Sequence, residues 1–269
     1  MNEFALRRNW GPAPSLERVK SYSRPKEFTV ISGPCSVESA EQIDYVASEI
    51  LPWATHLRGG TFRAGTYPNK NFGIVSEPLL AAFQHAARSR GLQNIMEVLS
   101  YQDYELDLYM KYADCFQVGC RQMQNYTLLK IVAESGKPVF LKRSTGATID
   151  EFLGAAEHLL FHGAKEIYLI ERGSSGFARH VRWDLSISMI PAVQAITDIP
   201  ILVDASHGTG RRDLVAPMTY AGVAAGADGV LIECHPSPEN SLSDSEQAIL
   251  PSEFREIMTK AAMIRSIKW

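Results

Sequence analysis

The sequence predicts an α/β protein: a single (β/α)8 TIM barrel with a short N-terminal extension. Eight short apolar runs recur along the chain, an amphipathic stretch follows each of them, and 269 residues suit one barrel of roughly 250 residues. No composition break or Pro/Ser-rich linker divides the chain. We therefore expect an extension over residues 1–27 and one barrel domain over residues 28–269.

The predicted strands are mostly continuous apolar runs, as expected for strands that are buried on both faces. They cover residues 28–35, 55–63, 93–99, 115–120, 138–144, 166–172, 200–207 and 229–235. Helical patterns such as EPLLAAFQHAARSRG and TIDEFLGAAEHLLFHG lie between them, several closed by a glycine. This alternation implies right-handed βαβ units and a parallel sheet. An open doubly wound sheet is the alternative, but no G-x-G-x-x-G turn follows the first strand.

Composition and charge exclude several classes of function. The formal net charge is −3, so nothing indicates a surface for nucleic acid or anionic membrane. No apolar run approaches the ~20 residues that span a bilayer, and the N-terminus lacks the apolar core of a signal peptide. We expect a cytoplasmic protein. The four cysteines form no CxxC pair or disulfide framework, and we expect Cys115 and Cys120 to be buried thiols.

The ends of the predicted strands carry an unusual number of polar residues. The active site of a (β/α)8 barrel lies at the C-terminal ends of its strands. The candidates there are Cys35, Arg58, Arg63, Glu97, Arg121, Lys142, Arg143, Arg172, Asp204, His207, Glu233 and His235. Two groups separate by chemistry, one cationic and one made of residues that ligate metals.

The positive charges of the cationic group would repel one another unless an anion lay between them. The members of this group are Arg58, Arg63, Arg121, Lys142 and Arg172. The planar fork of arginine suits carboxylates and phosphates, so the group predicts a small, multiply charged substrate.

The second group joins Cys35, His207 and Glu233 with Asp244 in the loop after the last strand. A thiolate, an imidazole and two carboxylates can bind a divalent metal such as Mn²⁺, Fe²⁺, Co²⁺ or Zn²⁺. The alternative is a buried cysteine beside ordinary polar strand ends.

Long motifs in this sequence resemble a known family. They are GPCSVES, LRGG, QVGCRQMQN, LKRS, LIERG, LVDASHGTGRRDLV and IECHPSPENSLSDSEQAI, in that order from about residue 29 to residue 250. The chain is similar to the 3-deoxy-D-arabino-heptulosonate 7-phosphate (DAHP) synthases of type Iβ, which also resemble the 3-deoxy-D-manno-octulosonate 8-phosphate synthases. The resemblance implies a metal-dependent, aldol-like condensation of phosphoenolpyruvate with an aldose, erythrose 4-phosphate in a DAHP synthase, releasing inorganic phosphate. It also implies a homo-oligomer, dimer or tetramer.

The resemblance also assigns site residues. Arg58, Arg63 and Lys142 would hold the carboxylate of phosphoenolpyruvate, and Arg121 and Arg172 its phosphate. Cys35, His207, Glu233 and Asp244 fall on the four metal ligands of the family. Lys142 and a metal-bound water, assisted by Glu97 or Asp204, are the candidates for proton transfer.

One loop departs from the family pattern. After LRGG, DAHP synthases carry lysine-proline-arginine-threonine, whose arginine helps to bind the phosphate of erythrose 4-phosphate. The aligned residues here are Arg63, Ala64, Gly65 and Thr66, and we expect Thr66 to contact substrate. Gly65 offers no side chain, so Lys70, Arg211 or Arg212 would supply the missing charge, or the acceptor is a different, unphosphorylated aldehyde.

Two further hypotheses differ in class. One is a Schiff-base aldolase with Lys142 as nucleophile, which leaves the ligand-type residues unexplained. The other is a non-catalytic relative that binds a phosphorylated metabolite, which predicts losses among the ligands and cations that the sequence does not show.

Overall fold

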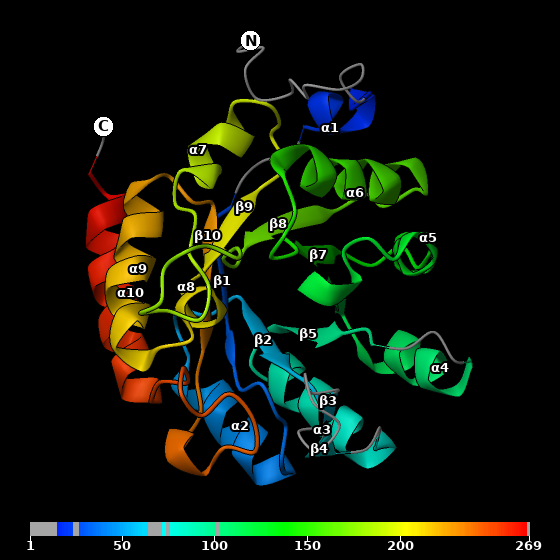
Figure 1. Ribbon diagram of the computed structural model, residues 1–269. Coiled ribbons are helices and arrows are strands. Elements are labelled where there is room, and N and C mark those ends of the chain that lie inside the picture. Colours follow the sequence, from blue (N-terminus) through cyan, green and yellow to red (C-terminus); the bar gives the residue numbers. More distant parts are fainter. Residues whose placement is uncertain (1–14, 24–26, 64–71, 74–75, 100–102, 268–269) are drawn as a thin grey trace.

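The computed structural model describes residues 15–23, 27–63, 72–73, 76–99 and 103–267, and these form a closed parallel barrel ringed by helices (Figure 1). The strand order around the barrel is β1-β10-β9-β8-β7-β6-β5-β2. Each pair in this order is parallel, as right-handed β-α-β crossovers require. The predicted (β/α)8 barrel is confirmed.

Each predicted apolar run contains a barrel strand. The strands are β1 (Thr29–Gly33), β2 (His56–Gly59), β5 (Gln93–Glu97), β6 (Cys115–Val118), β7 (Val139–Lys142), β8 (Ile167–Glu171), β9 (Ile201–Asp204) and β10 (Gly229–Glu233). The helices are α1 (Glu17–Ser21), α2 (Ala40–Glu49), α3 (Glu77–Arg88), α4 (Asp103–Tyr112), α5 (Tyr126–Glu134), α6 (Ile149–Phe161), α7 (Met189–Gln194), α8 (Ala205–Thr209), α9 (Arg212–Ala224) and α10 (Pro251–Arg265). Two 3₁₀ turns, η3 (Cys120–Gln122) and η4 (Pro238–Asn240), follow β6 and β10.

All eight strands end before their predicted runs do, and the differences are largest for the runs 200–207 and 55–63. The run 200–207 is a strand only to Asp204, because the Asp204 carboxylate accepts the backbone N–H of His207 at 3.0 Å and so caps α8, which holds His207. The run 55–63 leaves the barrel after Gly59. Its last residues form β3 (Phe62–Arg63), which pairs antiparallel with β4 (Phe72–Gly73) in a separate two-stranded sheet.

The barrel interior is filled by side chains from its strands. Ile31, Ile95, Cys115, Phe140, Tyr168, Ile170, Leu202 and Leu231 form this buried cluster. A second, larger cluster lies between the strands and the helices. Because both faces of the sheet are buried, the strands read as continuous apolar runs in the sequence. Cys115 is a buried thiol as predicted, whereas Cys120 is only half-buried, because it lies in the turn that follows β6.

Local signals set the helix boundaries. Thr148 and Glu151 form a reciprocal capping box at the start of α6, and Ser39 accepts the backbone N–H of Gln42 at the start of α2. Gly163, just after α6, has φ +94°, a conformation that favours glycine. Among the described helices, none combines the length and apolar character needed to cross a bilayer.

Part of the predicted N-terminal extension packs on the barrel. Val19 of α1 and Leu16, the residue before α1, are buried. The backbone N–H of Val19 donates to the carboxylate of Glu157 in α6 at 2.9 Å. Thr197 donates its hydroxyl to the carbonyl of Val19 at 2.6 Å. The domain boundary at residue 27 stays a prediction.

Candidate active site

A cavity of about 240 Å³ opens where the C-terminal ends of the strands meet. This is the end at which the sequence places the site. The predicted site residues that line the cavity are Cys35, Arg58, Glu97, Arg121, Lys142, Arg172 and His207. They come from separate strands and loops along the chain, and the closed barrel brings them together.

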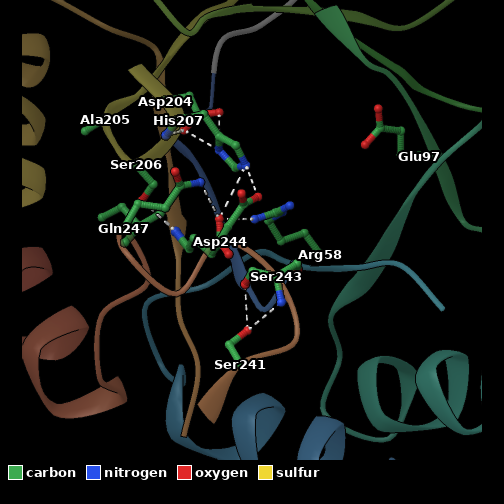
Figure 2. Close-up of polar contacts among 12 residues, drawn as sticks. Arg58, Glu97, Asp204, Ala205, Ser206, His207, Ser241, Ser243, Asp244 and Gln247 are labelled. Atoms are coloured by element: carbon green, nitrogen blue, oxygen red, sulfur yellow. Dashed lines mark hydrogen bonds and ion pairs between the residues drawn. The ribbon is translucent and has the colours of Figure 1, made fainter. Parts of the chain in front are cut away.

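The metal-ligand types lie at one side of this cavity. Ligand atoms of Cys35, Glu233 and Asp244 all lie within 4.8 Å of one another, so these three residues could hold a metal ion. His207 adjoins them, with Nε2 at 3.3 Å from Glu233 Oε2 and 3.9 Å from Asp244 Oδ2 (Figure 2). β1 and β10 are neighbours with Gly33 opposite Glu233, which places Cys35 beside Glu233.

Asp204 fixes the orientation of His207. Its carboxylate lies 2.9 Å from His207 Nδ1, and this contact turns Nε2 toward Glu233 and Asp244. Burial lowers the pKa of His207 to about 3, which keeps the imidazole neutral. Burial alone would raise the pKa of Asp204, but His207 and Lys142 hold it well below its usual value. A neutral imidazole, a thiol and two carboxylates fit a divalent transition metal.

Two of the predicted cations are already compensated by carboxylates of the protein. Lys142 Nζ lies 2.9 Å from Asp204 Oδ2, and Arg58 Nη1 lies 3.5 Å from Glu233 Oε2. Burial would lower the pKa of Arg58, but Glu233 raises it, so the guanidinium stays charged. The expectation that all five cations need an external anion is therefore too broad, because Arg58 and Lys142 have internal partners.

Arg172 differs from these two. Its side chain follows β8 and is only 5% exposed, yet Nε and Nη1 have no hydrogen-bond partner among the described residues. A buried guanidinium with open donors is the arrangement expected for an anion site. Arg121, in η3, lies at the exposed rim of the same cavity.

Glu97 faces the cavity from β5. Gln117 donates to Glu97 Oε2 at 3.3 Å, and a side chain at Gly119 would collide with Glu97 Oε1. Figure 2 shows Glu97 apart from the cluster around His207 and Asp244.

The remaining predicted residues lie outside the cavity or outside the described part of the chain. Arg211 pairs on the surface with Asp213 at 2.6 Å, and Arg212 donates to the carbonyl of Ser245 at 2.9 Å. Neither lines the cavity. The backbone of Arg63 belongs to β3, whereas Gly65, Thr66 and Lys70 lie outside the described residues.

The sequence interpretation missed Arg182, Trp183 and Gln247. The first two line the cavity from the loop after β8, and Arg182 Nη1 lies 3.8 Å from Asp244 Oδ1. Gln247 is buried and donates to Glu233 Oε2 at 2.9 Å. Strand ends alone could not reveal them, but the loop after β8 belongs to the catalytic face and carries several cations in SSGFARHVRWD, a signal that could have been used.

The model of the DAHP synthetase I family matches residues 21–266. The chain belongs to the DAHP synthetase I family. A relative from Thermotoga maritima, phospho-2-dehydro-3-deoxyheptonate aldolase, is 40% identical over 232 residues, which are 86% of this chain and 68% of that protein. A 2-dehydro-3-deoxyphosphooctonate aldolase from Desulfotalea psychrophila is 25% identical over 266 residues, covering 88% of this chain and 89% of the relative.

Solved structures of this family agree with the barrel. The Thermotoga maritima DAHP synthase superposes with a TM-score of 0.84 at 38% identity, covering 89% of this chain and 69% of that structure. A truncated form of the same enzyme gives a TM-score of 0.81, and 87% of it is covered. The predicted resemblance to DAHP synthases is confirmed, and the chain is an enzyme of this family.

Proposed function

We propose that this enzyme condenses phosphoenolpyruvate with erythrose 4-phosphate and releases inorganic phosphate, the reaction of a DAHP synthase. The observation that carries the proposal is the cavity itself. It is lined both by Arg172, whose buried guanidinium has open donors, and by Cys35 of the Cys35–Glu233–Asp244 cluster, in a member of the DAHP synthetase I family. The first group suits a doubly charged enol phosphate, and the second suits the metal that such a condensation uses.

Phosphoenolpyruvate would bind by both charged ends. Arg172 and Arg121 would receive its phosphate, while Arg58, Arg63 and Lys142 would hold its carboxylate. Holding both ends orients C3 toward the acceptor and removes much of the entropic barrier to reaction. Thr66, which lies outside the described residues, would also contact substrate.

Cys35, His207, Glu233 and Asp244 would hold one divalent ion, Mn²⁺, Co²⁺, Fe²⁺ or Zn²⁺. When bound, the ion supplies a Lewis acid that polarises the acceptor carbonyl. Asp204 maintains the neutral His207 in the orientation a ligand needs, and Gln247 holds Glu233 in place. Buried hydrogen bonds thus set the orientation of two of the four proposed ligands, His207 and Glu233.

The chain's own groups would move the protons. C3 of phosphoenolpyruvate attacks the aldehyde carbon, water adds at C2, and the hemiketal phosphate loses inorganic phosphate by C–O cleavage. Lys142 Nζ, backed by Asp204 at 2.9 Å, would donate a proton to the oxygen of the former aldehyde. Glu97, which lines the same cavity from the end of β5, would accept a proton from the attacking water.

The structure weighs against a Schiff-base aldolase. Lys142 is 4% exposed and its Nζ lies 2.9 Å from the fully buried carboxylate of Asp204, and a Schiff-base mechanism gives Cys35, Glu233 and Asp244 no role. A second acceptor is favoured by one observation, the glycine at position 65. Arg182, with a side chain 45% exposed at the cavity, replaces Arg211 and Arg212 as the candidate cation for an acceptor phosphate.

An assay of phosphoenolpyruvate consumption tests the proposal. The protein, loaded with Mn²⁺, is supplied with erythrose 4-phosphate, arabinose 5-phosphate or unphosphorylated erythrose, and released phosphate is measured. We expect phosphate release to be fastest with erythrose 4-phosphate. Faster release with another aldose would identify a different acceptor, and no release with any aldose would overturn the proposed chemistry.

A further inference from the structure

The loop after β8 folds back and brings Trp183 against Arg172. Ser174 and Asp184 form an antiparallel bridge through two backbone hydrogen bonds of 2.9 Å, which places Trp183 next to Gly173. Gly173 has φ +90°, and a Cβ there would lie 2.7 Å from the Cβ of Trp183. Glycine is therefore required at this position both by its backbone conformation and by the close approach of the tryptophan.

The indole of Trp183 lies against the Arg172 guanidinium. The Arg172 Cζ lies 5.4 Å from the centroid of the Trp183 ring, within the range of a cation–π interaction. Neither Nε nor Nη1 of Arg172 donates a hydrogen bond to any of the described residues. A contact with the ring face restrains the guanidinium without consuming its donors, which leaves them available to an anion.

Trp183 also brings a donor of its own. Its Nε1 is buried and has no hydrogen-bond partner in the described part of the chain, and Trp183 lines the same cavity as Arg172. A buried N–H without an acceptor is costly and uncommon in a folded protein. A bound anion in this cavity would satisfy Nε1 together with the open donors of Arg172.

We propose that Trp183 positions Arg172 and donates its indole N–H to the same anionic group, the phosphate of phosphoenolpyruvate. This inference rests on the proposed function, because it assigns the anion. Arg172 supplies the charge, whereas Trp183 sets its orientation and adds one neutral donor. The two contributions are separable, because phenylalanine preserves an aromatic face and removes the N–H.

The test compares Trp183→Ala and Trp183→Phe in the full chain loaded with Mn²⁺. Calorimetric titration with phosphoenolpyruvate should show affinity about 10–100-fold weaker for the alanine variant, which loses both the stacking and the donor. The phenylalanine variant should recover part of the loss and bind about 3–10-fold more weakly than the wild type. The KM for phosphoenolpyruvate should rise in step, while the KM for the aldose stays within about twofold.

Fluorescence gives a readout that does not depend on turnover. Trp53→Phe is the matched control, because Trp53 packs against the hydrophobic core and does not line the cavity. Phosphoenolpyruvate should change the emission of the Trp53→Phe protein and leave that of the Trp183→Phe protein nearly constant. It should also bind the Trp53→Phe protein with wild-type affinity.

The outcomes separate this inference from the proposed function. Equal phosphoenolpyruvate affinity in the wild type and in Trp183→Ala would overturn the inference and leave the proposed function standing. Tight binding that depends on Trp183, without phosphate release from any aldose, would support the inference and overturn the proposed function. If the wild type does not bind phosphoenolpyruvate, both are wrong. If Trp183→Ala does not fold, Trp183→Phe decides. The inference is contradicted if Trp183→Phe binds phosphoenolpyruvate with wild-type affinity and its emission still changes on binding as that of the wild type does.

Discussion

The two ends of the barrel use the same strands for opposite purposes. β7 begins at Val139 and ends at Lys142, and β9 begins at Ile201 and ends at Asp204. At the end that carries the cavity, charged side chains are buried: Arg58, Lys142, Arg172, Asp204 and Glu233. At the opposite end, the interior is closed mainly by apolar and neutral groups, with Phe140 stacked on Tyr168 at 4.3 Å.

The difference shows where this fold accepts the cost of burying charge. Removing a charged group from water costs several kcal/mol even when it is paired, and apolar packing of the same volume would often be more stable. The stability of the fold is therefore poorly explained by its two buried ion pairs, Lys142 with Asp204 and Arg58 with Glu233. Their place at the C-terminal ends of the strands, beside the open donors of Arg172, connects them with chemistry instead.

Two buried cysteines test this contrast most directly. Cys35 lies in the cavity and Cys115 in the opposite half of the barrel interior, where burial raises its pKa to about 12. We expect Cys35→Ala to lower activity by a factor of roughly 10³ or more, because a lost Lewis acid removes several kcal/mol of transition-state stabilisation. Phosphate release and metal content of the purified protein measure this effect.

Cys115→Ala is the matched variant for this comparison. It should keep its metal and its activity while losing about 1 kcal/mol of unfolding free energy in urea, because it leaves a small cavity in the barrel interior. Cys35→Ala should unfold within about 0.5 kcal/mol of the wild type when both are metal-free. Full activity of Cys35→Ala, or of chelated wild-type protein, would contradict the metal assignment.

A substitution on the acceptor side should change the kinetics less than the loss of the metal does. Restoring the family arginine with Gly65→Arg should lower the KM for erythrose 4-phosphate roughly 30–100-fold, because an arginine–phosphate contact contributes about 2–3 kcal/mol. The KM for phosphoenolpyruvate should change by no more than about twofold. Steady-state kinetics with each substrate varied in turn measure both values.

Gly65→Ala is the necessary control, since the turn could require the backbone freedom of glycine. A wild-type KM for erythrose 4-phosphate that is already in the low micromolar range would show that another cation replaces the arginine. Arg182 would then be the first residue to substitute, because it lines the cavity and its pair with Asp244 is long at 3.8 Å.

The sequence was sufficient for the barrel because its signals are local. Each strand reads as an apolar run, and capping residues such as Thr148 mark the helix starts. The rule that sites lie at strand ends then predicted a cavity lined by Cys35, Arg58 and Lys142. It also grouped Cys35, Glu233 and Asp244, which lie far apart in the sequence and together in the fold.

Contacts made by loops could not be predicted in the same way. Trp183 reaches Arg172 only because the backbone bridge between Ser174 and Asp184 folds the loop back, and no periodic pattern encodes that bridge. The pairing of Lys142 with Asp204 depends on how strands two positions apart in the barrel meet across its interior. Charge at a strand end was visible in the sequence, but the partner that compensates it was not.

At the other end of the barrel, His56 is a buried group whose effect should appear in stability alone. It is 7% exposed, its Nδ1 lies 2.8 Å from the hydroxyl of Thr55, and its ring packs edge-on to Phe140. Burial lowers the pKa of His56 to about 4, although a hydrogen bond with Gln93 and the carboxylates of Glu166 and Asp114 oppose the shift. The folded protein therefore keeps this imidazole neutral at a pH where the unfolded chain already binds a proton.

The sign of the pH dependence follows from that difference. The unfolded pKa of histidine is near 6.5, so between pH 6.5 and pH 4 protonation stabilises the unfolded state alone and the free energy of unfolding falls. For His56 the loss should reach roughly 2 kcal/mol at pH 5 relative to pH 7.5. Urea unfolding of wild type and His56→Gln at both pH values measures this loss. The variant should be less stable at pH 7.5, but its free energy of unfolding should fall less on acidification.

His85→Gln, at an exposed position of α3, is the control and should keep the wild-type pH dependence of stability. A pH dependence of stability in His56→Gln equal to that of the wild type would show that His56 gains its proton without unfolding, and activity at pH 7.5 should be unchanged because this end of the barrel carries no chemistry.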